Sequence, residues 1–152
     1  MKTFNRIIIC FSFVFISCSA VKTTEIYGTE TKIVDNVRSQ VLIKKFNAED
    51  KNKSFLVFAS GFDNVITVKN EDSIILNEKS RTLSILGYTN SCIILNNKEV
   101  TITIDNKQTV KLNKEKLPNY KFIYVGKDRN HYKIEYTNNA KTLSHEVCKL
   151  KS

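Results

Sequence analysis

The chain has 152 residues, a length that suits one domain around a single hydrophobic core and is too short for two domains of ordinary size. Its 24 basic and 15 acidic residues give a formal charge of +9, which would suit an anionic partner such as nucleic acid, a lipid surface or an acidic glycan. Arginines are few and the lysines are spread along the chain, so the composition argues against nucleic-acid binding.

The first 18 residues have the pattern of a secretory signal. Lys2 and Arg6 form a basic head, and Ile7–Ile16 follow as an apolar run. A run of about 7–15 apolar residues behind positive charge is typical of such a signal and is too short to span a bilayer. Ser17 and Cys18 end the run, and a small residue directly before a cysteine resembles the lipobox of bacterial lipoproteins. The resemblance implies that residues 1–17 are removed and that Cys18 is diacylated.

The two residues before Ser17 indicate which group of bacterial lipoproteins the signal resembles. Phe15 and Ile16 stand where the lipobox of enteric bacteria has leucine and a small residue, and Bacteroidota lipoproteins tolerate such residues. The chain therefore resembles a small lipoprotein of the flavobacterial type, which implies a lipid anchor in the outer membrane. Cleavage after Ala20, which would release a soluble periplasmic or secreted protein, is the alternative, and an uncleaved anchor is a weaker one.

Residues 18–31 carry little apolar periodicity and are predicted to form a flexible tether. An acidic cluster directly after the cysteine resembles the surface-export signal of Bacteroidota lipoproteins, and Ser19–Thr24 contain no acidic residue. We therefore expect the protein on the periplasmic face of the membrane.

Residues 32–152 are predicted to form one all-β domain. Isoleucine, valine, tyrosine, phenylalanine and threonine dominate, and no segment shows a sustained period of 3.6 residues. The predicted strands are Val37–Phe46, Ser54–Ala59, Asn64–Lys69, Ser73–Leu76, Thr82–Leu86, Cys92–Leu95, Val100–Ile104, Thr109–Leu112, Tyr120–Val125, Tyr132–Tyr136 and Leu143–Val147. Short strands separated by turn residues favour an antiparallel β-sandwich of about 8–10 strands, with an immunoglobulin-like arrangement or a small β-barrel as alternatives.

Four cysteines occur, of which Cys10 lies in the signal and Cys18 is the predicted lipid acceptor. Cys92 and Cys148 remain for the domain. An exported compartment permits a disulfide between them, and two buried free thiols are the alternative. The sequence leaves both open, because it does not show whether the side chains approach each other.

No constellation of catalytic or metal-binding residues stands out. His131 and His145 are the only histidines, and His145 lies three positions from Cys148, a spacing that points two strand side chains to opposite faces. The chain has no nucleophile elbow, phosphate loop or EF-hand loop. We therefore expect no metal, no cofactor and no enzymatic activity.

Aromatic residues alternate on two neighbouring predicted strands. Tyr120, Phe122 and Tyr124 lie on one strand, and Tyr132 and Tyr136 lie on the next, across a turn at residues 126–130. The favoured interpretation places this shared aromatic face in the core, with Lys121, Lys133 and Glu135 towards water. If it were exposed, it could stack on sugar rings or a peptide.

The predicted domain also resembles part of a group of known proteins. The stretch Phe58–Asn64, followed by Ile66, Val68 and Ile74, resembles the opening of small flavobacterial lipoproteins of unknown function, over residues 55–136. That resemblance implies a small β-sandwich and transfers no site residues. The sequence favours a lipid-anchored envelope protein with a non-enzymatic binding or structural role, acting on an unidentified protein or glycan. A periplasmic immunity or inhibitor protein, and a small hydrolase or glycan-binding protein, are the alternatives.

Overall fold

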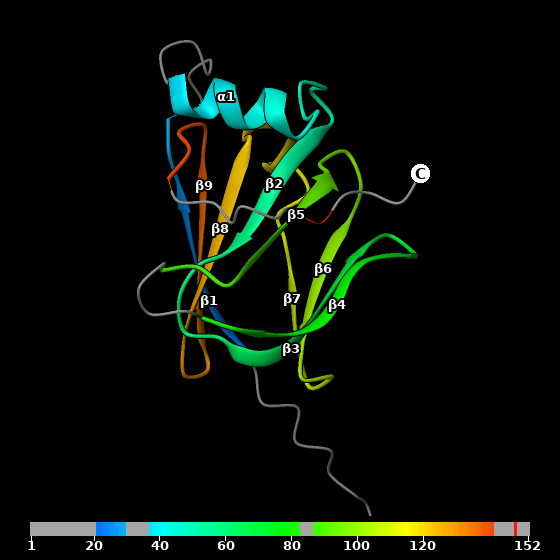
Figure 1. The fold of residues 1–152 in the computed structure, drawn as a ribbon. Helices are drawn as coiled ribbons and strands as arrows, with labels where there is room; N and C mark the ends of the chain where they lie inside the picture. The colour runs from blue at the N-terminus through cyan, green and yellow to red at the C-terminus, as the bar shows by residue number, and fades with distance from the viewer. Residues whose placement is uncertain (1–20, 30–36, 83–86, 142–147, 149–152) are drawn as a thin grey trace, which may run out of the picture.

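The computed structural model describes residues 21–29, 37–82, 87–141 and 148, which form two packed β-sheets and a helix (Figure 1). Sheet A has the strand order β1-β9-β8-β2-β5, and sheet B has the order β4-β3-β6-β7. The elements are β1 (Lys22–Tyr27), α1 (Val37–Lys45), β2 (Lys53–Phe58), β3 (Asp63–Asn70), β4 (Ser73–Arg81), β5 (Asn90–Leu95), β6 (Val100–Ile104), β7 (Gln108–Lys111), a 3-10 turn (Leu117–Asn119), β8 (Phe122–Asp128) and β9 (His131–Thr137). The predicted all-β sandwich is confirmed, and the sheets do not close into a barrel.

Sheet A is mixed rather than purely antiparallel. Strand β1 runs parallel to β9, and β2 runs parallel to β8, whereas the other neighbours in both sheets are antiparallel. Immunoglobulin-like sandwiches consist of two antiparallel sheets, so these two parallel pairs distinguish the fold from that pattern.

The segment expected to be a tether contains the edge strand of sheet A. Residues Lys22–Tyr27 pair with β9 along their whole length, from Lys22 opposite His131 to Tyr27 opposite Tyr136. The Tyr27 ring stacks on the Tyr136 ring with centroids 4.9 Å apart, which fixes this strand by side-chain packing. The first strand of the described residues therefore starts four positions after Cys18, which itself lies outside the described residues.

The central strands of sheet A are apolar on both faces because both faces are covered. In β2, Leu56 and Phe58 pack into the core between the sheets, while Phe55 and Val57 pack into a second core beneath α1. All four side chains are fully buried. A continuous apolar run is the expected pattern for a strand buried on two sides.

The predicted strand at residues 37–46 is wrong, since this segment forms helix α1. Its inward residues are Ser39, Leu42, Ile43 and Phe46, which follow the i, i+3, i+4, i+7 spacing of one helical face. The β-branched residues suggested a strand, but Val41 is 58 % exposed and contributes little to the packing. Figure 1 shows α1 lying across one end of sheet A, over β9, β8 and β2.

Within the described parts of the chain, no helix is long and apolar enough to cross a membrane. The predicted strands Thr82–Leu86 and Leu143–Val147 lie outside the described residues, except for Thr82.

Candidate functional site

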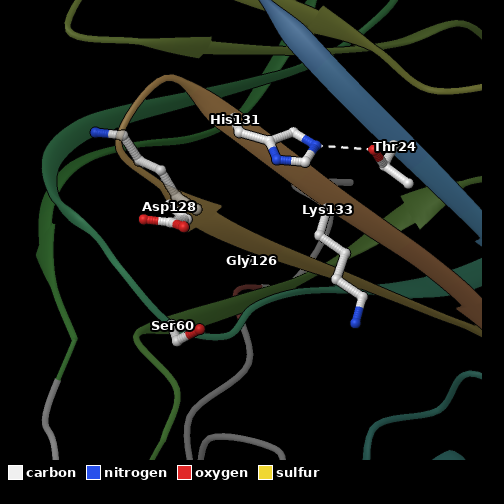
Figure 2. A pocket seen from close by; sticks show the side chains of 7 residues that line it. Thr24, Ser60, Gly126, Asp128, His131 and Lys133 are labelled. Atoms are coloured by element: carbon white, nitrogen blue, oxygen red, sulfur yellow. Dashed lines mark hydrogen bonds between the residues drawn. The ribbon is translucent and has the colours of Figure 1, made fainter.

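A shallow pocket opens on sheet A beside the β8–β9 turn, and we call it the hairpin pocket (Figure 2). Its volume is about 270 Å³. The lining residues are Thr24, Ser60, Gly126, Lys127, Asp128, His131 and Lys133. They come from β1, the connection after β2, and both strands of the hairpin, so the pocket joins segments that are distant in the sequence.

The pairing of the strands explains which side chains meet in the pocket. Residues alternate between the two faces of a strand, so Gly126 shares the face of Tyr124, which lies beneath α1. Lys133 is the β9 partner of Gly126, and Thr24 is the β1 partner of Lys133. Helix α1 covers one part of this face of sheet A, and the hairpin pocket occupies a part that lies further along the same strands.

The hairpin pocket is open above Gly126. This residue has no side chain, and a Cβ atom built at this position would meet only the Ser60 Oγ at 3.7 Å and the Lys133 carbonyl oxygen at 4.0 Å. These are ordinary van der Waals contacts, so a larger residue would project into the pocket without a clash at its Cβ. In the view of Figure 2, Asp128 and Lys133 lie on opposite sides of this glycine.

Hydrogen bonds hold the walls of the pocket in place. The Thr24 Oγ1 lies 2.8 Å from the His131 Nε2, which ties β1 to the end of the hairpin. The Lys127 amide donates to the Ser60 carbonyl oxygen at 2.8 Å, and the Lys127 ammonium donates to the Asn64 Oδ1 at 2.7 Å. The pocket therefore offers an ammonium on Lys133, a carboxylate on Asp128 and the hydroxyls of Thr24 and Ser60. These polar groups stand around a lining that is mainly carbon, so they could orient a ligand or a segment of a partner that packs against it.

A second hollow, of about 220 Å³, adjoins the first through Lys127. It lies at the β6–β7 turn, where the Asp105 carboxylate accepts hydrogen bonds from the Val65 amide at 2.8 Å and from the Asn64 side chain at 2.5 Å. The Val65 amide in particular holds the pKa of Asp105 below its usual range. Asp105 thus stays ionised and fixes this turn against β3.

The five aromatic residues do not form the exposed binding surface that was the alternative to burial in the core. Tyr120, Phe122, Tyr124, Tyr132 and Tyr136 are all buried, with at most 6 % of any side chain exposed. They do not share one face either, because Phe122 and Tyr124 lie beneath α1, whereas the other three lie between the two sheets. Burial raises the pKa of the Tyr124 hydroxyl to about 12.

The register of the hairpin explains this division. Asp128 pairs with His131, so the turn consists of Arg129 and Asn130 alone, a shorter turn than residues 126–130. Each even-numbered residue of β8 therefore faces an odd-numbered residue of β9, and Tyr124 lies opposite Glu135. A change of one residue in register moves every side chain of a strand to the other face.

Lys121 was expected to face water, and the structure buries it to 6 % exposure. Its ammonium donates to the backbone carbonyl oxygens of Asp50 and Lys53, each at 2.7 Å. Loss of hydration lowers the pKa of Lys121. Of the other two residues expected to face water, Lys133 is exposed, and Glu135 is half-buried in an ion pair with Lys141.

The remaining candidate residues are divided between described and undescribed parts of the chain. Cys18 and His145 lie outside the described residues. Cys92 and Cys148 lie opposite each other in an isolated parallel β-bridge, and their thiols are not joined in a disulfide. Among the described residues, no group of three or more histidine, cysteine or acidic side chains could hold a metal ion.

The sequence did not indicate the hairpin pocket. Thr24 and His131 are 107 positions apart, and neither belongs to a recognisable motif. The one signal in the sequence that indicates an opening is Gly126, which directly follows the predicted strand Tyr120–Val125. No family model, curated protein or solved structure matches the chain.

Proposed function

We propose that this chain is a lipid-anchored, non-enzymatic binding protein of the bacterial cell envelope, which presents the hairpin pocket close to the membrane. The observation that carries the proposal is the position of β1. This strand starts at Lys22, four positions after the lipobox-like cysteine, and Lys22 pairs with His131 of the pocket. The short distance along the chain links the anchor and the pocket.

The reach of the chain sets the distance between them. Four residue steps span at most about 14 Å even when fully extended. A domain held by a diacylated Cys18 would therefore keep its β1 end at the level of the lipid headgroups. Two acyl chains hold a protein stably, whereas one chain is marginal. The lack of acidic residues at Ser19–Thr24 supports the periplasmic leaflet of the outer membrane.

The lining of the pocket supports binding rather than a particular reaction. His131 already bonds to Thr24, and Lys127 already bonds to Asn64, so both groups act in holding the walls. The exposed residues Asp128 and Lys133 offer opposite charges to a ligand. A polar partner segment that carries both charges would match this arrangement.

Replacing Cys18 with alanine is expected to abolish incorporation of a clickable fatty acid in a Bacteroidota host. The reason is that the thiol of this residue is the proposed acceptor of the lipid. Labelling is read from a gel and the mature N-terminus from a mass spectrum. A Cys10→Ala variant is the matched control and should remain labelled, because Cys10 lies in the segment that is removed. A mature N-terminus at Val21, or a labelled Cys18→Ala variant, would refute the anchor.

Filling the pocket should weaken partner binding. Gly126→Leu places an apolar side chain over the pocket, and we expect at least about a tenfold loss of affinity for the partner captured from envelope fractions. Thr109→Leu is the control, because it adds an apolar side chain at an exposed position of β7 in the other sheet. Equal capture by both variants would exclude the pocket as the binding site. A captured toxin or hydrolase would favour the immunity or inhibitor alternative.

A further inference from the structure

Cys92 and Cys148 lie opposite each other at the β5 edge of sheet A. The Ile93 amide donates to the Cys148 carbonyl oxygen at 3.0 Å, and the Cys148 amide donates to the Ser91 carbonyl oxygen at 2.9 Å. These two bonds make Cys148 the parallel bridge partner of Cys92. Adjacent strands are about 4.8 Å apart, which falls within the Cα separation of about 4.4–6.8 Å that a disulfide can span.

Both thiols point towards the same core. Cys92 belongs to the core between the sheets, and Cys148 packs against that core. The Cys148 thiol also donates to the Ile75 carbonyl oxygen of β4 at 3.2 Å. Cys148 therefore lies where β5 of sheet A meets β4 of sheet B, with its side chain on the same side as that of Cys92.

We propose that Cys92 and Cys148 form a disulfide after export, which fastens the chain at residue 148 to β5 and closes the seam between the two sheets. The inference rests on the proposed function only for the oxidising compartment, in which such bonds persist. The oxidant is a disulfide, carried by a protein or by a small molecule.

The reaction proceeds by thiol–disulfide exchange, with Cys148 reacting first because it is partly exposed. Its thiolate attacks one sulfur of the oxidant, a mixed disulfide forms, and one oxidant thiolate leaves. The Cys92 thiolate then attacks the Cys148 sulfur, and the second oxidant thiolate leaves. The two cysteines lose two protons and two electrons, which reduce the disulfide of the oxidant to two thiols. Burial raises the pKa of the Cys92 thiol, which agrees with its place as the second nucleophile.

The first test treats the purified full chain with oxidised glutathione. Cys10→Ser and Cys18→Ser are introduced so that only the proposed pair remains. After alkylation and tryptic digestion without reductant, we expect residues 82–98 to be linked to residues 142–149. If the two peptides were recovered separately, each with an alkylated cysteine, under the same native conditions, the proposal would be overturned. This result does not depend on lipidation, so failure of the lipid anchor and failure of the disulfide are distinguishable.

The second test measures the thermal unfolding of the chain. The alkylation and tryptic digestion are also repeated on the exported protein. A reductant should lower the melting temperature of the oxidised chain by on the order of 10 °C, because it releases a long loop. The Cys148→Ser variant should not respond to the reductant, and its exposure makes it a mild substitution. The proposal would also be refuted if the reductant left the melting temperature of the oxidised chain unchanged, or if Cys92 and Cys148 were free thiols in all of the exported protein.

Discussion

Replacing Gly61 with alanine is expected to lower the free energy of unfolding by more than about 3 kcal/mol. Gly61 has a φ of +86°, and a Cβ atom there would lie 1.7 Å from the Lys127 carbonyl oxygen and 2.7 Å from its carbonyl carbon. Both are backbone atoms of β8, so the strand or the connection after β2 would have to move. That movement would break the bond from the Lys127 amide to the Ser60 carbonyl oxygen, which holds one wall of the hairpin pocket.

Gly87→Ala is the matched control for this prediction. Gly87 also has a positive φ, of +69°, but a Cβ atom there would meet nothing within 4 Å. Only the backbone strain of an L-residue remains, and it costs about 1–2 kcal/mol. Urea unfolding followed by far-ultraviolet circular dichroism gives both values, since the chain has no tryptophan. Equal losses in the two variants would show that the close approach of Gly61 to β8 does not constrain the fold.

Asn70→Ala is expected to lower the free energy of unfolding by about 3 kcal/mol, the sum of three hydrogen bonds of ordinary net strength. Asn70 ends β3 of sheet B and is 3 % exposed. Its side-chain amide donates to the carbonyl oxygens of Leu95 at 3.1 Å and Glu99 at 3.3 Å, and its Oδ1 accepts from the Leu95 amide at 2.6 Å. Because Leu95 ends β5 of sheet A, this side chain joins the two sheets at one end of the sandwich.

Asn77→Ala provides the comparison for Asn70→Ala. Asn77 lies on the edge strand β4, is exposed, and accepts a hydrogen bond from the Thr67 hydroxyl within sheet B. Such a substitution changes stability by about 0.5 kcal/mol or less. The same urea titration measures both variants. If Asn70→Ala cost no more than Asn77→Ala, the link between the sheets would be energetically unimportant.

The fold class and most strand positions could be predicted from the sequence, because they depend on the local alternation of apolar and polar residues. The alternation of Val100, Ile102 and Ile104 matches their burial in β6. Helix α1 was missed because its inward face begins with Ser39, a polar residue that bonds to the Ala140 amide. A polar residue at a buried helical position interrupts the apolar period on which the prediction depends.

The hairpin pocket was beyond prediction for a different reason. Its walls depend on the parallel pairing of β1 with β9, between segments about a hundred positions apart. Strand β1 lies at the edge of the sheet and is exposed on both faces, so it shows little apolar pattern. The orientation of the aromatic residues depended on the two-residue turn at Arg129 and Asn130. Neither pairing partners nor turn length follow from the period of a single strand.

Composition and alternation alone were sufficient to indicate an all-β domain, and the first 18 residues were sufficient to predict an address in the cell envelope. The tertiary structure decided which residues face each other: the helix over sheet A, the burial of Lys121 and the aromatic side chains, and the bridge between Cys92 and Cys148. The physical reason is that local sequence determines backbone preference and the side-chain period. The register between strands and the choice of partner are set instead by packing energy summed over the whole core.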